Sequence, residues 1–411
     1  MDTMQPLKGF RDFLPQKMAI RSEIIKRLKK VFEKYGFEEL QTPTLEYAEV
    51  LLGKYGEEAE KLMYIFDDPG GRKVGLRYDL TVPLARVVAS YPSLPIPFKR
   101  YQIQPAWRAE NTQRGRYREF YQCDIDTIGS SSPIADAEIL AIINDSLKAV
   151  GFSKYKIRIN SREVLFELVK SSGIPEELKF KTIQSIDKLD KKTKEEVEKE
   201  LSERNLSKDQ IKSLFENIEK ARPDEYLRQV IDMADSMGVA DNLVFDPKLA
   251  RGLDYYTGPI FETYVEEPKV GSLTGGGRYD KLLSSLGGRD LPAVGSTIGL
   301  ERIVEVAEEM NLIPDIKPTP VKVLVTIFSP DFLLQSVKVA SELREGGINV
   351  ELYSDENARL DKQMKYADER KIPFVIIMGP EEIATNKATL KNMFDKTQEQ
   401  IDLSSLSESL S

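Results

Sequence analysis

Three short segments of the sequence combine arginines, carboxylates, phenols and glycines in a way that suits a phosphate-bearing ligand. The first, FKRYQIQPAWRAENTQRGRYREFYQCDID, carries six basic residues against two acidic ones between Phe98 and Phe120. Guanidinium groups stay charged and donate planar, bidentate hydrogen bonds, so arginines along a hairpin that turns at Arg114 and Gly115 suit a polyphosphate. A basic surface hairpin without a ligand is the alternative that these residues leave open.

The second segment, LARGLDYYTGPIFE, places Arg251 in an otherwise apolar stretch that also contains the phenols of Tyr255 and Tyr256. An arginine beside two phenols is costly to bury without a ligand or a partner. The pattern therefore indicates either a ligand site or a structural salt bridge, and these residues by themselves favour neither.

The third segment, AVGSTIGLERI, places Gly295 and Gly299 before Arg302 and an apolar helix. Without side chains, the two glycines would let a flat ligand lie close to the backbone, with Arg302 projecting at the start of the helix. The glycines of LTGGGRYD lack the strand–GxGxxG–helix context of a dinucleotide site. We expect them to permit a close backbone approach in a strand or a turn.

Two counts exclude whole classes of chemistry, because the 411 residues contain no histidine and a single cysteine, Cys123. A Ser-His-Asp triad, an imidazole general base, a His-ligated metal, a four-Cys zinc site and an intrachain disulfide are impossible. The cysteine usage fits a reducing compartment, and no stretch approaches about 18 uninterrupted apolar residues. We expect a cytoplasmic protein with no membrane partner. The net charge of −8 does not exclude nucleic acid, because the charge near a binding surface is what matters.

The elements that must position these residues are an amphipathic helix, an edge strand and a strand with a polar face. MAIRSEIIKRLKKVFEKYG has helical spacing of its apolar residues, which are Ile20, Ile24, Leu28, Val31 and Phe32. FEELQTPTLEY has strand character, and Pro43 suits an edge strand or an interface. In RYREFYQCDIDTIG, a period of two places on one face Arg118, Phe120, Gln122, Asp124 and Asp126. Such a face must bury its carboxylates or present them to a ligand.

The predicted fold class is α/β, with a larger α+β domain formed by residues 1–164 plus 241–312. Between them, 165–240 is rich in Lys, Glu, Leu and Ile, which predicts two or three surface helices, either an inserted helical subdomain or a solvated arm. The prolines of NLIPDIKPTP indicate a linker at 313–320. Alternating strands and helices then predict a smaller α/β domain with a mostly parallel sheet at 321–411.

These segments, in this order, resemble the signature motifs of class II aminoacyl-tRNA synthetases, and specifically of histidyl-tRNA synthetases. The resemblance runs from KGFRDFLP through the motif 1-like YGFEELQTPTLEY, the LRYDLT element and the motif 2-like AWRAENTQRGRYREFYQCDID. It continues through RGLDYYTG and GGRYD to the motif 3-like GSTIGLER and the C-terminal α/β domain. Motifs 2 and 3 specify only the class, whereas RGLDYYTG together with LRYDLT specifies the amino acid.

The resemblance implies an antiparallel active-site sheet flanked by helices, a homodimer formed through motif 1, and activation of L-histidine with ATP and Mg²⁺ before transfer to the 3′ end of tRNA(His). It implies three catalytic arginines. Arg108 would hold the α-phosphate and the amino acid carboxylate, Arg251 the α-phosphate, and Arg302 the γ-phosphate. The further ATP-binding residues that it implies are Glu110, Arg116 and Phe120.

A pocket for neutral imidazole must read one hydrogen-bond donor and one acceptor, which an acid and a phenol can do. The positions that match the imidazole readers of the family are Asp126 and Tyr256, with Gln122 and Tyr255 nearby. The positions that match the α-amino site are Asp79 and Thr81, and Arg108 and Arg251 complete the histidine site. No residue is assigned as a metal ligand, and the ligands of Mg²⁺ are left open.

Two alternatives remain. The first is a histidine-binding regulatory subunit of ATP phosphoribosyltransferase, although such paralogues typically lose the motif 2 and motif 3 arginines and the C-terminal domain. The second is a synthetase for another amino acid, which would leave RGLDYYTG unexplained. The C-terminal domain has 11 basic and 15 acidic residues, so its tRNA-binding role rests on resemblance alone. Either a localised RNA-binding patch or a solvated helix face could be formed by Arg359, Lys362, Lys365, Arg370 and Lys371.

Overall fold

The computed structural model of the chain divides into two compact units, of which Arg21–Pro314 forms most of one and Asp315–Ser411 most of the other. This division falls within the predicted linker, while the predicted bounds of the helical insertion remain a prediction. The described residues are 4–53, 62–251, 255–268, 270–285 and 289–410.

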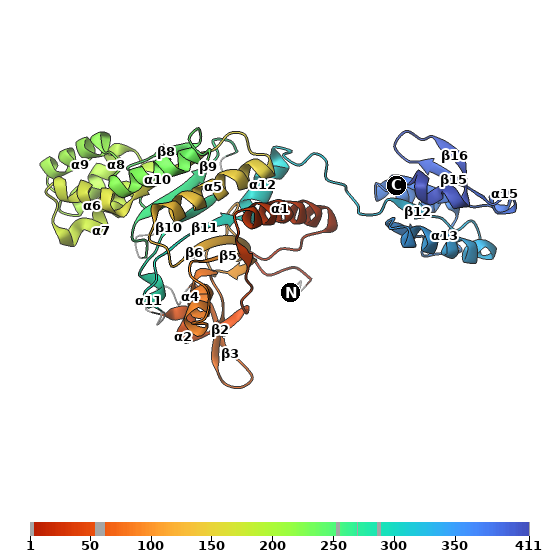
Figure 1. Cartoon of the computed structure of the whole chain (residues 1–411), viewed down its shortest axis with the longest axis horizontal. Coiled ribbons are helices and arrows are strands. Elements are labelled where there is room, and N and C mark those ends of the chain that lie inside the picture. Colours follow the sequence, from red (N-terminus) through yellow and green to blue (C-terminus); the bar gives the residue numbers. More distant parts are fainter. Residues whose placement is uncertain (1–3, 54–61, 252–254, 269, 286–288, 411) are drawn as a thin grey trace. The chain divides into compact units, whose positions relative to one another are not determined.

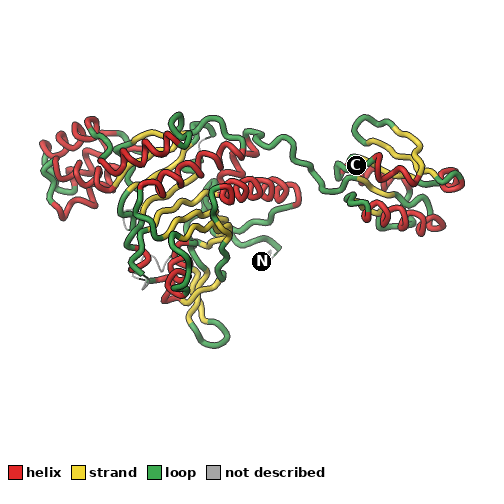
Figure 2. The backbone as a smooth tube through the Cα atoms, viewed as in Figure 1, coloured by secondary structure: helices red, strands yellow, loops and turns green. Residues whose placement is uncertain are grey.

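The larger unit is built on an eight-stranded sheet (Figures 1 and 2). Its strands, in spatial order, are β1 (Glu38–Glu39), β5 (Phe98–Trp107), β6 (Glu119–Ile128), β11 (Ala293–Gly299), β10 (Thr274–Arg278), β9 (Pro259–Tyr264), β7 (Lys156–Ser161) and β8 (Leu243–Phe245). Neighbouring strands from β5 to β7 are antiparallel, and the edge strands β1 and β8 pair in parallel. The predicted antiparallel sheet is therefore confirmed for its central strands.

Helices pack against this sheet with their apolar sides. α5 (Pro133–Val150) contacts β6, β10 and β11, and α12 (Leu300–Glu309) contacts β6 and β11. Ser132 caps α5, whose first residue is proline, and the helix ends at Gly151 with a φ of 112°. In the predicted amphipathic helix, α1 (Pro15–Lys34), the residues at 24, 28, 31 and 32 are buried as expected, whereas Ile20 is only half-buried.

The segment around Pro43 differs from the single strand that the sequence suggested. It contains β1, at the edge of the large sheet, and β2 (Leu45–Tyr47), with the proline between them. β2 belongs to a separate three-stranded sheet with β4 (Lys73–Leu76) and β3 (Tyr64–Asp67), next to α2 (Ala48–Leu52). The LRYDLT element, residues 76–81, connects the end of β4 to the first residue of α4 (Thr81–Ser90).

The charged segment after β7 folds into five α-helices rather than the two or three expected. They are α6 (Arg162–Ser171), α7 (Lys179–Ile186), α8 (Lys194–Glu203), α9 (Lys208–Lys220) and α10 (Glu225–Ser236) (Figure 1), with short 3₁₀ helices at Glu176–Leu178 and Asp187–Asp190. Thr193 and Ser207 form capping boxes that start α8 and α9, so the charged run is divided into short helices. α10 packs against α5.

The smaller unit has a five-stranded sheet in the order β13 (Val350–Leu352), β12 (Val323–Val325), β14 (Phe374–Ile377), β15 (Lys387–Asn392) and β16 (Gln398–Asp402). The predicted parallel strands are β13, β12 and β14; the antiparallel pairs made by β15 and β16 were not predicted. Its helices are α13 (Leu333–Glu345), α14 (Leu360–Glu369), α15 (Pro380–Ala384) and α16 (Leu406–Ser409). Ser329 and Pro330 begin a 3₁₀ turn directly before α13.

Candidate active site

A cavity of about 380 Å³ brings the three unusual segments together. Its lining comes from β6, β10, β11, the loop between β5 and β6, the start of α12 and the LRYDLT element. The predicted site residues that line it are Asp79, Thr81, Arg108, Glu110, Arg116, Phe120, Gln122, Arg251, Tyr255, Tyr256 and Arg302. Asp126 is the one predicted site residue that does not line it.

Arginines give this cavity its positive charge. Burial lowers the pKa of Arg302, and the nearby charges of Arg116 and Arg251 lower it further. Arg302 is held by hydrogen bonds from its guanidinium to the backbone oxygens of Ser272 and Gly115. Such a concentration of positive charge suits a polyanionic ligand.

Arg251 is positioned by an acid and by a missing side chain. Its Nη1 lies 2.6 Å from Oε1 of Glu262 on β9. Burial alone would lower the pKa of Arg251, but Glu262 and the neighbouring phenols more than offset it and raise the pKa. A Cβ atom at Gly275 would overlap the guanidinium, so this glycine makes room for Arg251. The three residues after Arg251, 252–254, lie outside the described residues.

Arg108 and Phe120 lie together on the hairpin side of the cavity. The guanidinium carbon of Arg108 is 5.0 Å from the Phe120 ring centroid, and its Nε donates to the Tyr78 backbone oxygen at 3.0 Å. Asp79 accepts a hydrogen bond from the backbone N–H of Val82 in the first turn of α4, at 3.0 Å. Burial raises the pKa of Asp79, and the Arg108 charge opposes that rise. Phe120 thus presents its ring beside a cation at the cavity wall.

Glu110 and Arg116 form an ion pair across the motif 2-like loop. Nε of Arg116 lies 2.6 Å from Oε2 of Glu110, and half of the Arg116 side chain is exposed. An ion pair this exposed contributes about 0–1 kcal/mol, so a bound phosphate can compete for the arginine. The two predicted ATP contacts are thus adjacent and contact each other.

The two phenols of RGLDYYTG stand side by side. The ring centroids of Tyr255 and Tyr256 are 4.3 Å apart, with the planes tilted by 45°. Burial raises the pKa of both phenols, in Tyr256 against the opposing Arg251 charge, so both are neutral near pH 7. A Cβ atom at Gly277 would lie 2.9 Å from the Tyr256 ring. The glycines of LTGGGRYD therefore permit the close backbone approach expected of them, because the atoms nearest to a Cβ at Gly276 and at Gly277 are the backbone oxygens of Gly295 and Pro259.

Asp126 lies behind the cavity wall. Its Oδ2 is 2.7 Å from Nη2 of Arg100, and its Oδ1 accepts a hydrogen bond from the Tyr279 hydroxyl. A Cβ atom at Gly295 would overlap this carboxylate, so Gly295 makes room for Asp126 and not for a flat ligand, which corrects the expectation from sequence. Gly299 does line the cavity. The imidazole-reading role of Asp126 remains a prediction.

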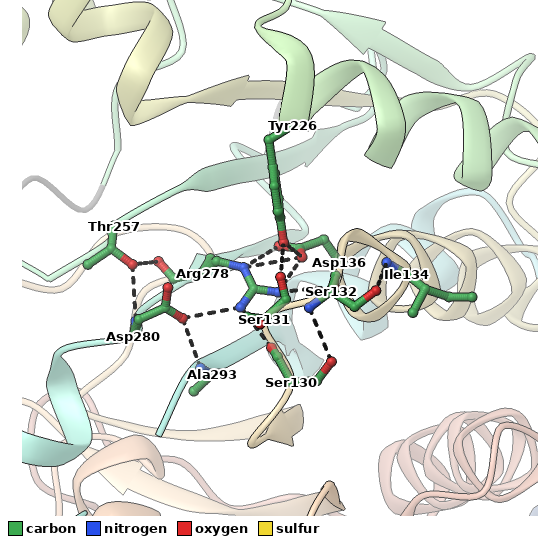
Figure 3. A network of polar contacts seen from close by, with 10 residues as sticks. All are labelled: Ser130, Ser131, Ser132, Ile134, Asp136, Tyr226, Thr257, Arg278, Asp280 and Ala293. Atoms are coloured by element: carbon green, nitrogen blue, oxygen red, sulfur yellow. Dashed lines mark hydrogen bonds and ion pairs between the residues drawn. The ribbon is translucent and has the colours of Figure 1, made fainter. Parts of the chain in front are cut away.

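A buried network connects the GGRYD segment to two helices (Figure 3). Arg278 forms an ion pair with Asp136 in the first turn of α5, and the Tyr226 hydroxyl on α10 donates to Asp136 at 2.8 Å. Arg278 Nη1 also reaches Asp280 at 3.2 Å, and the Thr257 N–H donates to the Arg278 backbone oxygen at 2.7 Å. The network thereby fixes the segment that directly follows the two phenols.

The sequence interpretation missed the partners that hold this site. Glu301 lines the cavity, and its carboxylate is neutralised by ion pairs with Arg21 at 2.8 Å and with Arg11. Arg21 lies on the apolar stripe of α1, three residues before Ile24, and a buried charge in such a stripe was a usable signal. Thr297 also lines the cavity. Its polar side chain, two residues from each glycine of AVGSTIGLERI, was a second usable signal.

The residues proposed for an RNA-binding patch are paired with acids. Each of the five cations lies within 4.0 Å of a carboxylate, in the pairs Arg359–Asp361, Lys362–Asp355, Lys365–Glu369, Arg370–Glu351 and Lys371–Asp368. These pairs favour the alternative of a solvated helix face of mixed charge.

Neither a metal cage nor a membrane span is found in the described part of the chain. No group of three or more Asp, Glu or Cys side chains there could hold a metal ion. Likewise, no helix among the described residues is long and apolar enough to cross a membrane.

The comparisons with known proteins decide the family. The family model for histidyl-tRNA synthetase matches residues 9–303, more than half of the chain. The chain belongs to the histidyl-tRNA synthetase family. A second family model, for an anticodon binding domain, matches residues 322–411, which coincide with the predicted C-terminal domain.

Full-length members of the histidyl-tRNA synthetase family are similar throughout. The histidine–tRNA ligase of Aeropyrum pernix is 42% identical to this chain, over 94% of this chain and 93% of its own length. The histidine–tRNA ligase of Gloeobacter violaceus is 38% identical, over 98% of this chain and 97% of its own length. The crystal structure of histidyl-tRNA synthetase from Nostoc sp. PCC 7120 superposes with a TM-score of 0.87 at 29% identity, covering 100% of this chain and 99% of that one. The antiparallel sheet and the C-terminal domain are thus family features.

Proposed function

We propose that this chain is a histidine–tRNA ligase. It activates L-histidine with ATP to histidyl-adenylate and pyrophosphate, and then transfers histidine to the 3′ end of its tRNA. The observation that most directly supports this proposal is the convergence of Arg108, Arg251 and Arg302 on one cavity that also contains two neutral phenols. Family membership and the match to full-length histidine–tRNA ligases support it independently.

The activation step requires cations and no proton-abstracting base. The histidine carboxylate, already ionised, attacks the α-phosphorus of ATP; the new P–O bond forms as the bond to pyrophosphate breaks, and no proton moves. Negative charge on the phosphorus oxygens is stabilised by positioned guanidinium groups. A chain without any histidine can therefore catalyse this step. In the second step a ribose hydroxyl of tRNA attacks the adenylate carbonyl. The new ester C–O bond forms as the bond to AMP breaks, and the hydroxyl proton passes to a phosphate oxygen of the departing AMP.

The anchoring of each arginine supports its proposed role. Arg251, held by Glu262 at 2.6 Å, lies next to Tyr256 and would stabilise the α-phosphate beside the amino acid. Arg302, at the start of α12, would hold the γ-phosphate. Because Arg21 and Arg11 neutralise Glu301, this neighbouring acid does not repel the polyphosphate.

Polar groups in the same cavity would select histidine. Asp79 and Thr81 would receive the α-ammonium group, and the neutral phenol of Tyr256 would hydrogen-bond the imidazole. An apolar amino acid would leave these groups unpaired, which is how a polar site discriminates strongly without editing.

Mg²⁺ would enter with ATP. In nucleotide sites this ion is usually held by substrate phosphates together with one or two carboxylates, and the carboxylates that line this cavity are Asp79, Glu110 and Glu301. We also propose a cytoplasmic homodimer. The exposed Leu45 and Tyr47 of β2, in the motif 1-like segment, support such an interface.

Arg251→Ala tests the proposal. We expect histidine-dependent ATP–pyrophosphate exchange to fall by at least about a thousandfold, because one positioned charge at the reacting phosphate is lost. The control is Arg228→Ala, which removes an exposed arginine on α10 that pairs with Glu225. Both variants should keep the unfolding temperature of the wild type. Near-normal exchange in Arg251→Ala would contradict the proposed role.

The regulatory-subunit alternative predicts a different result. A solved structure described as an ATP phosphoribosyltransferase regulatory subunit/histidyl-tRNA synthetase, from Bacillus halodurans, has a TM-score of 0.74 at 24% identity, which shows a shared fold alone. A regulatory subunit would show no histidine-dependent exchange in the wild type, whereas a ligase would. The retained arginines at 108, 251 and 302 favour the ligase.

A further inference from the structure

A chain of three polar side chains runs from the cavity wall into the sheet. Gln122 and Thr297 line the cavity, and Asp124 lies one step behind them, opposite Thr297 in the β6–β11 ladder. The Thr297 hydroxyl donates to Asp124 Oδ1 at 2.7 Å, and Gln122 Nε2 donates to the Thr297 hydroxyl oxygen at 3.3 Å. None of the cavity chemistry proposed above uses Asp124 or Thr297.

The direction of these hydrogen bonds is set by the acid. An ionised carboxylate can only accept, so the single proton of the Thr297 hydroxyl points to Asp124. The hydroxyl oxygen then accepts from the amide nitrogen of Gln122. This orientation turns the amide oxygen of Gln122 away from Thr297. That oxygen is buried, has no hydrogen-bond partner among the described residues, and belongs to a side chain that is 94% buried at the cavity wall.

We propose that Asp124 is a positioning residue: through Thr297 it holds the Gln122 amide nitrogen, which leaves the unpartnered amide oxygen to accept a hydrogen bond from an N–H donor of bound histidine. This inference rests on the proposed function, because it presumes that histidine occupies the cavity. The proposal adds Asp124 and Thr297 to the histidine site, and Asp124 acts on the ligand only through Thr297 and Gln122.

The surroundings of Asp124 make its carboxyl group change charge near neutral pH. The net pKa of Asp124 is raised to about 7. Burial raises it most, the Arg100 cation, 4.0 Å away on β5, lowers it, Asp126 raises it, and the Thr297 hydrogen bond lowers it. Asp79 adds a further small rise, and the phenols of Tyr256 and Tyr279 also face this group.

The protonation state of Asp124 decides how the Thr297 and Gln122 hydrogen bonds are oriented. Above about pH 7 the acid is ionised and orients the relay as described. Below that pH it is protonated and can itself donate to Thr297, so the hydroxyl can donate to the Gln122 oxygen and the amide can present its NH₂ group instead. The relay therefore favours histidine binding on the alkaline side.

Substitution of Thr297 tests the relay without changing any charge. Thr297→Val is nearly isosteric but has no hydroxyl, and Thr297→Ser keeps the hydroxyl. We expect Thr297→Val to raise the KM for histidine about tenfold in ATP–pyrophosphate exchange, with the KM for ATP within about twofold of the wild type. Thr297→Ser should remain within about threefold of the wild type for both. Equal histidine KM values in the Val and Ser variants would overturn the proposal.

Asp124→Asn tests the pH dependence. The substrate's imidazole titrates in the same range, so the useful quantity is the ratio of kcat/KM for histidine between variant and wild type at each pH, in which substrate titration cancels. The ratio should be near one below about pH 6 and fall about tenfold above about pH 8. A ratio that stays constant across this range indicates a merely structural carboxylate and overturns the proposal.

These outcomes are separable from a failure of the proposed function. If the wild type shows no histidine-dependent exchange, the ligase assignment fails and the relay has no substrate to orient. If the wild type is active and the Thr297 and Asp124 variants behave like it, only the relay fails. Should Asp124→Asn not fold, the Thr297 pair still decides the question.

Discussion

At the scale of single residues, glycines determine where the charged side chains of the cavity can lie. Gly275 on β10 has no Cβ because the Arg251 guanidinium occupies that space, and Gly295 on β11 does the same for the Asp126 carboxylate. Each strand thus lacks a side chain at the position where a neighbouring segment places a long polar one. The sequence could show that glycines cluster there, but not which side chain each one accommodates.

Gly275→Ala should therefore act on catalysis more than on stability. The new methyl group would meet the end of a flexible side chain, Arg251, which can swing away from Glu262 at little cost to the fold. We expect histidine-dependent exchange to fall about a hundredfold, while the unfolding temperature changes by less than about 3 °C. Comparison with Arg251→Ala provides the control, since the double variant should be no worse than Arg251→Ala alone. Additive losses would show that Gly275 acts by another route.

The residue types of the cavity were predictable, whereas their partners were not. Arginine and tyrosine in apolar or glycine-rich segments stand out in the sequence, and eleven of the twelve predicted site residues line one cavity. Glu262 and Glu301 did not stand out, because the partner of a charge is set by strand register and by helix placement over long separations. Asp126 shows the same limit: its strand face was predicted correctly, but Arg100 and Tyr279 could not be seen beside it.

At the scale of elements, the Arg278 network attaches helix α10 to the catalytic sheet. Asp136 on α5 is fully buried and receives both the Arg278 guanidinium and the Tyr226 hydroxyl (Figure 3). The same arginine contacts Asp280, and its backbone oxygen receives the Thr257 N–H. Through this network, α10 helps to hold the backbone segment that directly follows Tyr255 and Tyr256.

Tyr226→Phe and Asp136→Ala should differ greatly in cost. The first removes one hydrogen bond and should lower the free energy of unfolding by about 1 kcal/mol, with exchange kinetics unchanged. The second leaves the Arg278 charge buried without its main partner and should cost about 3–5 kcal/mol. Urea unfolding followed by tyrosine fluorescence measures both, with Tyr91→Phe, at an exposed tyrosine, as the control. Similar costs for the two variants would show that the ion pair does not dominate this network.

The helical segment shows which signals in the sequence were sufficient and which were overlooked. Its helical character follows from composition, but the number of helices follows from caps. Thr193 with Glu196, and Ser207 with Gln210, fit the S/T-x-x-E/Q pattern and form capping boxes in the structure. The antiparallel β15–β16 pair had no comparable signal, because short strands joined by a polar turn are weakly specified by local sequence.

At the scale of the whole molecule, the overall charge and the charge of the cavity have opposite signs. The chain carries a net charge of −8, yet the lining of the cavity has four arginines against three carboxylates, and one of these, Glu301, is neutralised by Arg11 and Arg21. The basic residues on α14 and directly before it are each paired with an acid, so they do not form an uncompensated patch. The net charge of a synthetase therefore says little about its substrates, and the local arrangement of guanidinium groups says more.

The central claim, that this cavity activates histidine, is tested most directly by ATP–pyrophosphate exchange with the wild-type chain across a panel of amino acids. We predict exchange with histidine and, at equal concentration, at least about a thousandfold less with leucine, threonine, proline or glycine, because each leaves buried polar groups unpaired. Absence of exchange with every amino acid, or a clear preference for one other than histidine, would contradict the account.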